Sequence, residues 1–186
     1  MTIAATPMPL PEVLLIEPRL FGDERGFFLE THHQQKYEAS GLGRTFVQDN
    51  HSRSRKNVLR GLHYQLQNPQ GKLVYPVTGE IFDVAVDIRR GSPTFGQWTG
   101  ARLSEANHRQ LFIPEGFAHG FLVLSESADV IYKCTDFYAP GDEYGIYCMD
   151  EKIGIDWPQA RPVLSEKDRR LPELGNTREE YLPVYT

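Results

Sequence analysis

Residues 81–88, Ile-Phe-Asp-Val-Ala-Val-Asp-Ile, are the stretch that most clearly decides the fold class. Every even-numbered position in this stretch is apolar, whereas the odd-numbered positions include two aspartates, Asp83 and Asp87. An alternation with a period of two predicts a β-strand with one apolar face and one mixed face. Because carboxylates are rarely left unpaired in a core, the mixed face is expected to meet water or a ligand.

Eight weaker runs rich in β-branched and aromatic residues surround this strand, and turn signals such as Pro69-Gln70-Gly71 separate them. The runs are 13–16, 26–29, 58–64, 72–77, 98–103, 109–113, 120–124 and 130–135. Their number and spacing predict a mainly β chain folded as an antiparallel sandwich or closed barrel, and favour a jelly-roll barrel. Two short helices are expected outside it, one within 31–40 and one after Ser165.

The composition indicates one folded domain over residues 1–186. Hydrophobic residues make up 40% of the chain and charged residues 24%, as in globular domains. The net charge of −5 argues against a broad basic surface for nucleic acid or an anionic membrane, and no apolar run reaches the roughly 18 residues of a membrane span. Cys134 and Cys148 form no CxxC motif and the start of the chain resembles no secretory leader, so a cytoplasmic location is expected.

Two short segments resemble the sequence boxes of the cupin superfamily of small jelly-roll barrels: residues 60–65, Arg-Gly-Leu-His-Tyr-Gln, and 114–119, Pro-Glu-Gly-Phe-Ala-His. In metal-binding cupins the first box carries His-x-His followed by Glu, and the second box supplies another histidine. Here Gln65 replaces the second histidine, which leaves His63 and His119. A neutral amide is a poor transition-metal ligand, so the barrel is predicted to be metal-free. The alternative is that His51 completes a set of three histidines.

Longer segments resemble the dTDP-4-dehydrorhamnose 3,5-epimerase family, from about residue 13 to about residue 171. The segments are FGDERGFF (21–28), FVQDNHS (46–52), NVLRGLH (57–63), FDVAVD (82–87), SPTFG (92–96) and IPEGFAHGF (113–121). The resemblance implies a metal-free, cofactor-independent cupin homodimer. Its implied reaction converts dTDP-4-dehydro-6-deoxy-D-glucose to dTDP-4-dehydro-L-rhamnose in dTDP-L-rhamnose biosynthesis.

The residues can be weighed against this chemistry. A hydrogen next to a ketone is weakly acidic, so inverting such a carbon needs a base, a group that stabilises the enolate oxygen, and an acid on the opposite face. The resemblance assigns these roles to His63 as base, Lys72 as stabiliser and Tyr132 as acid, with Asp168 orienting the histidine. Tyr138 is the rival acid. Considered alone, each could instead be a core or surface residue.

The resemblance also implies a set of substrate-binding residues. They are Arg25, Phe27, Glu30, Gln48, Asp49, Asn50, Arg60, His119, Tyr138, Glu143 and Lys167. Arginine suits a nucleoside diphosphate because its planar fork grips phosphate with two hydrogen bonds. Arg60 lies three residues from His63, which places the two on opposite faces of a regular strand unless Gly61 forms a bulge or Arg60 lies at the strand end. Arg25, Phe27 and Glu30 are expected to reach the partner subunit's site.

Three alternatives stay open at this point. The first is an epimerase acting at one centre only, or a keto-isomerase, on a related dTDP-keto sugar. The second is a non-catalytic cupin that binds a nucleotide sugar, and the third is a metal-dependent cupin oxygenase. The joint presence of His63, Lys72, Tyr132 and Asp168 argues against the non-catalytic cupin, and the double epimerase is the leading hypothesis.

Overall fold

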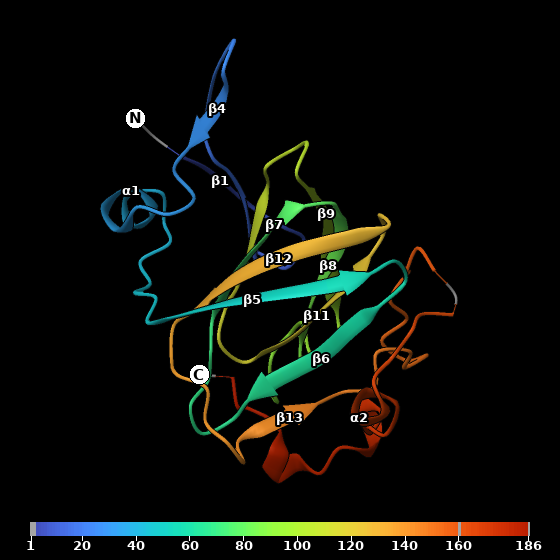
Figure 1. Ribbon diagram of the computed structural model, residues 1–186. Helices are drawn as coiled ribbons and strands as arrows, with labels where there is room; N and C mark the ends of the chain where they lie inside the picture. Colours follow the sequence, from blue (N-terminus) through green and yellow to red (C-terminus); the bar gives the residue numbers. More distant parts are fainter. Residues whose placement is uncertain (1–2, 160, 186) are drawn as a thin grey trace.

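The computed structural model describes residues 3–159 and 161–185, which form thirteen strands, two short α-helices and two 3-10 helices (Figure 1). The strands are β1 (Ala4–Pro7), β2 (Leu14–Glu17), β3 (Leu20–Asp23), β4 (Gly26–Leu29), β5 (Gln48–Arg55), β6 (Leu59–Gln65), β7 (Lys72–Thr78), β8 (Glu80–Asp87), β9 (Trp98–Ser104), β10 (Gln110–Ile113), β11 (Phe117–Val123), β12 (Ser127–Cys134) and β13 (Glu143–Gly145). The helices are α1 (Gln34–Ala39), α2 (Glu166–Arg169), η1 (Leu174–Asn176) and η2 (Glu179–Tyr181).

Two antiparallel sheets face one another. One has six strands in the order β1-β2-β10-β7-β12-β5, and the other has five in the order β13-β6-β11-β8-β9. Neighbours such as β10 and β2 are far apart in sequence, as in a jelly roll. The predicted mainly β, cupin-type jelly-roll barrel is therefore confirmed. The hairpin β3-β4 forms a separate two-stranded sheet that projects away from the barrel (Figure 1).

Residues 81–87 lie in β8, and Ile88 begins the following loop. The mixed face of this stretch does not meet water as expected. Its even-numbered side chains pack in a core with residues of the C-terminal segment, including Ile146 and Trp157. Its odd-numbered side chains face the other sheet, where Ile81 joins the interior core. Asp83 and Asp87 on this inner face are both 0% exposed. The expectation failed in part because buried protein groups, rather than solvent, satisfy these carboxylates.

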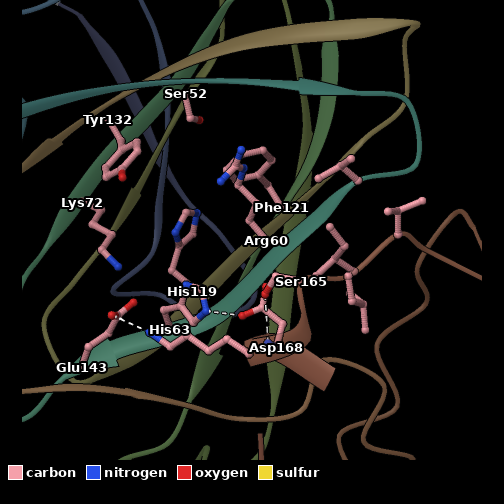
Figure 2. A pocket seen from close by; sticks show the side chains of 15 residues that line it. Ser52, Arg60, His63, Lys72, His119, Phe121, Tyr132, Glu143, Ser165 and Asp168 are labelled. Atoms are coloured by element: carbon pink, nitrogen blue, oxygen red, sulfur yellow. Dashed lines mark hydrogen bonds and ion pairs between the residues drawn. The ribbon is translucent and has the colours of Figure 1, made fainter. Parts of the chain in front are cut away.

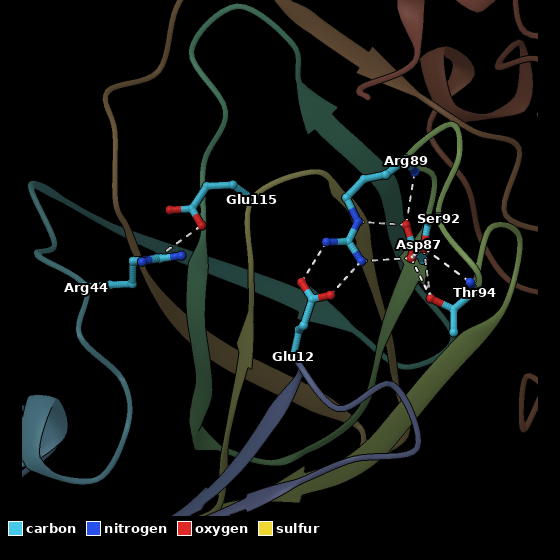
Figure 3. Close-up of polar contacts among 7 residues, drawn as sticks. All are labelled: Glu12, Arg44, Asp87, Arg89, Ser92, Thr94 and Glu115. Atoms are coloured by element: carbon cyan, nitrogen blue, oxygen red, sulfur yellow. Dashed lines mark hydrogen bonds and ion pairs between the residues drawn. The ribbon is translucent and has the colours of Figure 1, made fainter. Parts of the chain in front are cut away.

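Asp87 is held by a dense set of donors (Figure 3). The Arg89 guanidinium donates to both of its oxygens, through Nε at 3.0 Å and Nη2 at 2.9 Å, and also pairs with Glu12 at 2.6 Å. The hydroxyls of Ser92 and Thr94 donate to the same carboxylate. Burial raises the pKa of Asp87, but these hydrogen bonds outweigh it and the pKa lies below its ordinary value. Asp87 therefore fixes the loop after β8 as an ionised buried group.

All nine predicted strands overlap observed ones, and both predicted helices are present. Helix α1 covers the outer face of the six-stranded sheet, where Tyr37 packs with Leu73 and Phe112. Four strands were not predicted, namely β1, β3, β5 and β13. Among the described residues, no helix combines the length and apolar character needed to cross a membrane.

Candidate active site

A cavity of about 530 Å³ opens between the two sheets (Figure 2). It is lined by Ser52, Val58, Leu59, Arg60, His63, Lys72, His119, Phe121, Tyr132, Glu143, Val163, Leu164, Ser165, Lys167 and Asp168. A smaller cavity of about 170 Å³ shares His63, Lys72, Tyr132 and Glu143 with it and extends the space towards Gln48, Asn50, Gln65 and Tyr138. All four predicted catalytic residues therefore line one continuous space.

His63 on β6 contacts Asp168 on α2, with 2.6 Å between Nε2 and Oδ1. Ser165 caps α2 by accepting a hydrogen bond from the backbone N–H of Asp168, so the predicted cap is present and fixes the carboxylate beside the imidazole. Burial raises the pKa of Asp168, but the hydrogen bond from His63 outweighs it and the pKa is lowered. An ionised Asp168 accepts from the Nε2–H of His63, which leaves Nδ1 with a free lone pair.

A bulge in β6 places Arg60 and His63 on the same cavity. In the pairing with β11, His63 lies opposite His119 but Arg60 lies opposite Phe121, so β6 has one residue more than its partner strand. Gly61 occupies the bulge with φ +116°, and a Cβ there would lie 2.5 Å from the carbonyl oxygen of His119. The bulge therefore requires glycine and resolves the conflict between the offset of three and a shared cavity.

Tyr132 and Lys72 come from the opposite wall. They lie on β12 and β7 of the six-stranded sheet, whereas His63 lies on the five-stranded sheet, and Figure 2 shows their side chains directed into the space above His63. Burial raises the pKa of Tyr132, which keeps its hydroxyl protonated at neutral pH. Burial lowers the pKa of Lys72, partly offset by nearby groups including Glu143 and Asp83.

A second His–Asp pair lies beneath the cavity. His119 on β11 contacts Asp83 on β8, with 3.0 Å between Nε2 and Oδ2, and both side chains are buried. Burial raises the pKa of Asp83, although His119 and Lys72 partly counteract it. This pair orients the His119 ring towards the cavity, beside His63 on the adjacent strand. The sequence signal for it was the mixed face of residues 81–88, which showed a carboxylate without showing its partner.

The two cavities contain seven of the eleven predicted substrate-binding residues. They are Gln48, Asn50, Arg60, His119, Tyr138, Glu143 and Lys167. Glu143 pairs with Lys167 at 2.6 Å. Burial raises the pKa of Glu143, but Lys167, together with His63 and Tyr138, outweighs it and the pKa is lowered. Arg60 Nε donates to Ser54 Oγ at 2.9 Å. The guanidinium is thereby directed along the cavity wall.

The other four predicted substrate-binding residues lie elsewhere. Arg25 and Phe27 belong to the projecting hairpin, where Arg25 pairs with Asp23 and its side chain is 85% exposed. Glu30 follows the hairpin and pairs with Lys36. Asp49 points away from the cavities, because it alternates with Gln48 and Asn50 along β5, and it pairs with Lys133 at 2.6 Å. Within one described subunit these four do not join the site.

The alternative metal set that included His51 does not fit the structure. His51 points outwards from β5 and contacts Asp129 at 2.9 Å. Over residues 3–159 and 161–185, no three His, Cys, Asp or Glu side chains gather closely enough to hold a metal ion. His63 and His119 are instead each paired with a carboxylate of their own.

Sequence reasoning missed several residues that line the cavity. Ser52 and Phe121 had no assigned role, and the segment 163–165 was not predicted to form a wall. The alternation of Gln48 and Asn50 along a strand could have predicted that Ser52 faces the same way. Phe121 lies two residues after His119 on β11, so the same alternation could have predicted it, whereas the segment 163–165 depends on tertiary packing and left no local signal.

A jelly-roll barrel with a His–Asp pair on one wall and a lysine and a tyrosine on the facing wall has the architecture of a cupin-type acid–base isomerase. Such a site moves protons on a carbon next to a carbonyl group and stabilises the enolate between the two transfers.

Comparison with known proteins identifies the family. The family described as dTDP-4-dehydrorhamnose 3,5-epimerase matches residues 7–176. The chain is 61% identical over 168 residues to dTDP-4-dehydrorhamnose 3,5-epimerase of Pseudomonas aeruginosa, covering 89% of this chain and 93% of that protein. It superimposes with a TM-score of 0.95 at 53% identity on dTDP-6-deoxy-D-glucose-3,5-epimerase of Legionella pneumophila in complex with dTDP-4-keto-L-rhamnose, covering 99% of both chains. A 3'-monoepimerase of Streptomyces bikiniensis in complex with dTDP-quinovose gives 0.91 at 31% identity, covering 97% of this chain and 93% of that one. The chain belongs to the dTDP-4-dehydrorhamnose 3,5-epimerase family.

Proposed function

We propose that this chain catalyses the 3,5-epimerisation of dTDP-4-dehydro-6-deoxy-D-glucose to dTDP-4-dehydro-L-rhamnose, without a cofactor, in dTDP-L-rhamnose biosynthesis. The observation that carries the mechanism is the position of His63 and Tyr132 on facing sheets across one cavity. Inversion needs proton removal from one face of the sugar and proton return from the other. The membership of the family supplies the substrate.

In the first step His63 takes the proton from a carbon next to the C4 ketone. The electron pair of the broken C–H bond moves into the ring to form an enolate, and the imidazole becomes positively charged. Asp168, 2.6 Å from Nε2, stabilises this imidazolium and holds the ring in place. The pKa of Asp168 is lowered, so the carboxylate is ionised at neutral pH.

The enolate oxygen then needs a positive partner. The ammonium form of Lys72 on the cavity wall can supply that charge, and because it lies in a region of low dielectric its attraction for the oxygen is stronger than in water. This attraction grows as negative charge develops on the oxygen. Lys72 therefore stabilises the transition state more than the bound ketone.

In the second step Tyr132 donates its phenolic proton to the opposite face of the same carbon, which inverts the configuration. The tyrosine oxygen is left negative and His63 is left protonated, and proton exchange with water restores both groups. The same cycle at the second carbon completes the reaction. The raised pKa of Tyr132 keeps the donor protonated before each cycle.

The polar wall suits a nucleoside diphosphate. Arg60 and Lys167 contribute positive charge to the cavity and are assigned to the diphosphate. The half-exposed ring of Tyr138 offers a flat face to the nucleobase. Gln48, Asn50 and His119 supply hydrogen-bonding groups.

The remaining assignments concern the assembly. We assign the chain to a single domain that forms a homodimer in the cytoplasm. Support for the dimer comes from exposed aromatic residues on the projecting hairpin, where Phe27 and Phe28 are 62% and 64% exposed. Two buried thiols, Cys134 and Cys148, suit a reducing compartment.

Turnover of the keto sugar in deuterated water tests the proposed function. The double epimerase is expected to place deuterium at both C3 and C5 and to invert both centres. Label at one centre only would indicate the single-centre alternative. That alternative is specific because one similar structure is a 3'-monoepimerase. Absence of label at both carbons would contradict catalysis and would leave a nucleotide-sugar-binding cupin.

A further inference from the structure

Gln65 occupies the position where a metal-binding cupin carries a ligand histidine, and its amide makes three hydrogen bonds to loop backbone. Nε2 donates to the carbonyl oxygens of Asn68 at 2.7 Å and Phe137 at 3.2 Å, and Oε1 accepts from the N–H of Ala139 at 2.9 Å. The Gln65 side chain is buried, with 5% of the residue exposed. Both ends of the amide are therefore committed to backbone groups on either side of Tyr138.

A second glutamine holds the same segment from the facing sheet. The Tyr138 N–H donates to Gln48 Oε1 at 2.8 Å, and Gln48 lies on β5 whereas Gln65 lies on β6. The backbone at residues 137–139 is thus hydrogen-bonded to both sheets. These hydrogen bonds do not involve the side chains of the segment, and Phe137 and Tyr138 are 62% and 52% exposed.

The segment matters because Tyr138 lines the smaller cavity together with Gln65 itself. An exposed aromatic ring on a loop binds a flat ligand well only if the backbone that carries it is already ordered, since ordering it upon binding lowers the affinity. We propose that Gln65 is a positioning residue that holds residues 137–139 so that the Tyr138 ring faces the nucleobase. The proposal rests on the assignment of Tyr138 to the nucleobase in the proposed function.

Removal of the amide tests this role, with dTDP as the probe. Gln65→Met keeps the length and bulk of the side chain and loses all three hydrogen bonds. Calorimetric titration is expected to show about tenfold weaker dTDP binding, because the loop must then be ordered by the ligand. The KM of the keto sugar is expected to rise by a similar factor while kcat stays within about twofold, since His63 and Tyr132 are untouched.

Gln110→Met is the matched control. Gln110 is also buried, donates to the carbonyl oxygen of Thr31 and accepts from the hydroxyl of Tyr37, each at 2.9 Å. Its loss removes comparable hydrogen bonds outside both cavities. It is expected to lower thermal stability and to leave dTDP affinity within about twofold of the unmodified protein.

The double variant decides whether Gln65 acts through Tyr138. Tyr138→Ala alone is expected to weaken dTDP binding, and Gln65→Met added to it is expected to weaken binding by less than about twofold more. A full tenfold loss in the Tyr138→Ala background would overturn the positioning role, as would unchanged affinity in Gln65→Met alone. If Tyr138→Ala itself binds dTDP normally, the nucleobase assignment fails and the role of Gln65 fails with it.

A second variant guards against misfolding. Gln65→Glu retains the acceptor for the Ala139 N–H and loses both donors, so it is expected to show the same pattern if Gln65→Met does not fold. In Gln65→Met, hydrogen exchange at the amides of Tyr138 and Ala139 is expected to be faster than in the unmodified protein, whereas in Gln65→Glu, which keeps the acceptor for Ala139, the faster exchange is expected at Tyr138. Unchanged exchange at both amides would contradict the proposal.

Discussion

His63 and Asp168 are separated by 105 residues in sequence, yet their side chains lie 2.6 Å apart, with the carboxylate almost wholly buried. Asp168→Asn keeps the shape of this contact but removes the negative charge that stabilises the imidazolium. We expect kcat to fall about a hundredfold to ten-thousandfold with little change in KM, measured by steady-state kinetics. Glu166→Gln removes an exposed carboxylate from the same helix and is the control. Normal kcat in folded Asp168→Asn would show that the contact is only structural.

Tyr132→Phe separates proton removal from inversion. The base is intact, so the enolate should form and His63 should return a solvent proton to the face from which it came. Mass spectrometry and NMR of the recovered sugar should then show deuterium incorporation with retained configuration. Tyr138→Phe keeps the ring but loses the rival hydroxyl, and it should invert normally. Normal inversion in folded Tyr132→Phe, with its loss in Tyr138→Phe, would reverse the assignment.

Lys72→Met should stabilise the fold while it abolishes turnover. Because burial lowers the pKa of Lys72 below the ordinary 10.5, the folded state disfavours the charged form. This penalty is complete below the folded-state pKa and disappears as pH rises from that value to the unfolded one. The gain in Tm should therefore be a few degrees at neutral pH and should shrink in alkaline buffer. A lower Tm at pH 7, measured by calorimetry, would contradict this account of Lys72.

Exhaustive chelation should leave the activity unchanged. The expectation follows from the donor set, because Gln65 is engaged with backbone groups and the two cavity histidines are each paired with a carboxylate. The assay compares kcat before and after dialysis against a strong chelator. Loss of turnover that one added metal ion restores would overturn the metal-free assignment.

Complementation between inactive variants tests whether Arg25 acts in the partner's site. Arg25→Ala and His63→Ala should each be inactive, whereas dimers that contain one of each have one site with both residues intact. Random exchange should restore about a quarter of normal activity. The control pair, His63→Ala with Asp168→Asn, damages residues of the same subunit's site and should restore none. If the Arg25 pair also restores none, or if sedimentation shows a fully active monomer, the shared site is wrong.

Apart from β4, whose Phe27 and Phe28 are exposed, the strands that the sequence predicted have an apolar face, because burial against a core leaves a period-two pattern. Strand β5 was missed since it reads Gln-Asp-Asn-His-Ser-Arg-Ser-Arg, with no apolar position at all. One face of β5 lines the cavities and the other carries ion pairs such as that between His51 and Asp129. A strand with polar residues on both faces has no alternation of apolar and polar positions from which it could be predicted.

The candidate site was foreseen through family motifs more than through local patterns. Nothing local could place Asp168 beside His63, because the contact depends on α2 packing against β6. The alternation of side chains along a strand predicted that Arg60 and His63 would lie on opposite faces. A bulge at Gly61 was one of the two ways in which the sequence analysis could bring them to the same face. The partner of Asp83 could not be stated, since pairing with His119 depends on the register of β8 with β11.

Ribosomes make a chain from its amino end, so every strand of the barrel, including β13 at Glu143–Gly145, is synthesised before Asp168. Completion of the His63–Asp168 pair therefore waits until nearly the whole chain has been made. A chain interrupted before α2 keeps Arg60 and His63 but has no carboxylate partner for its base.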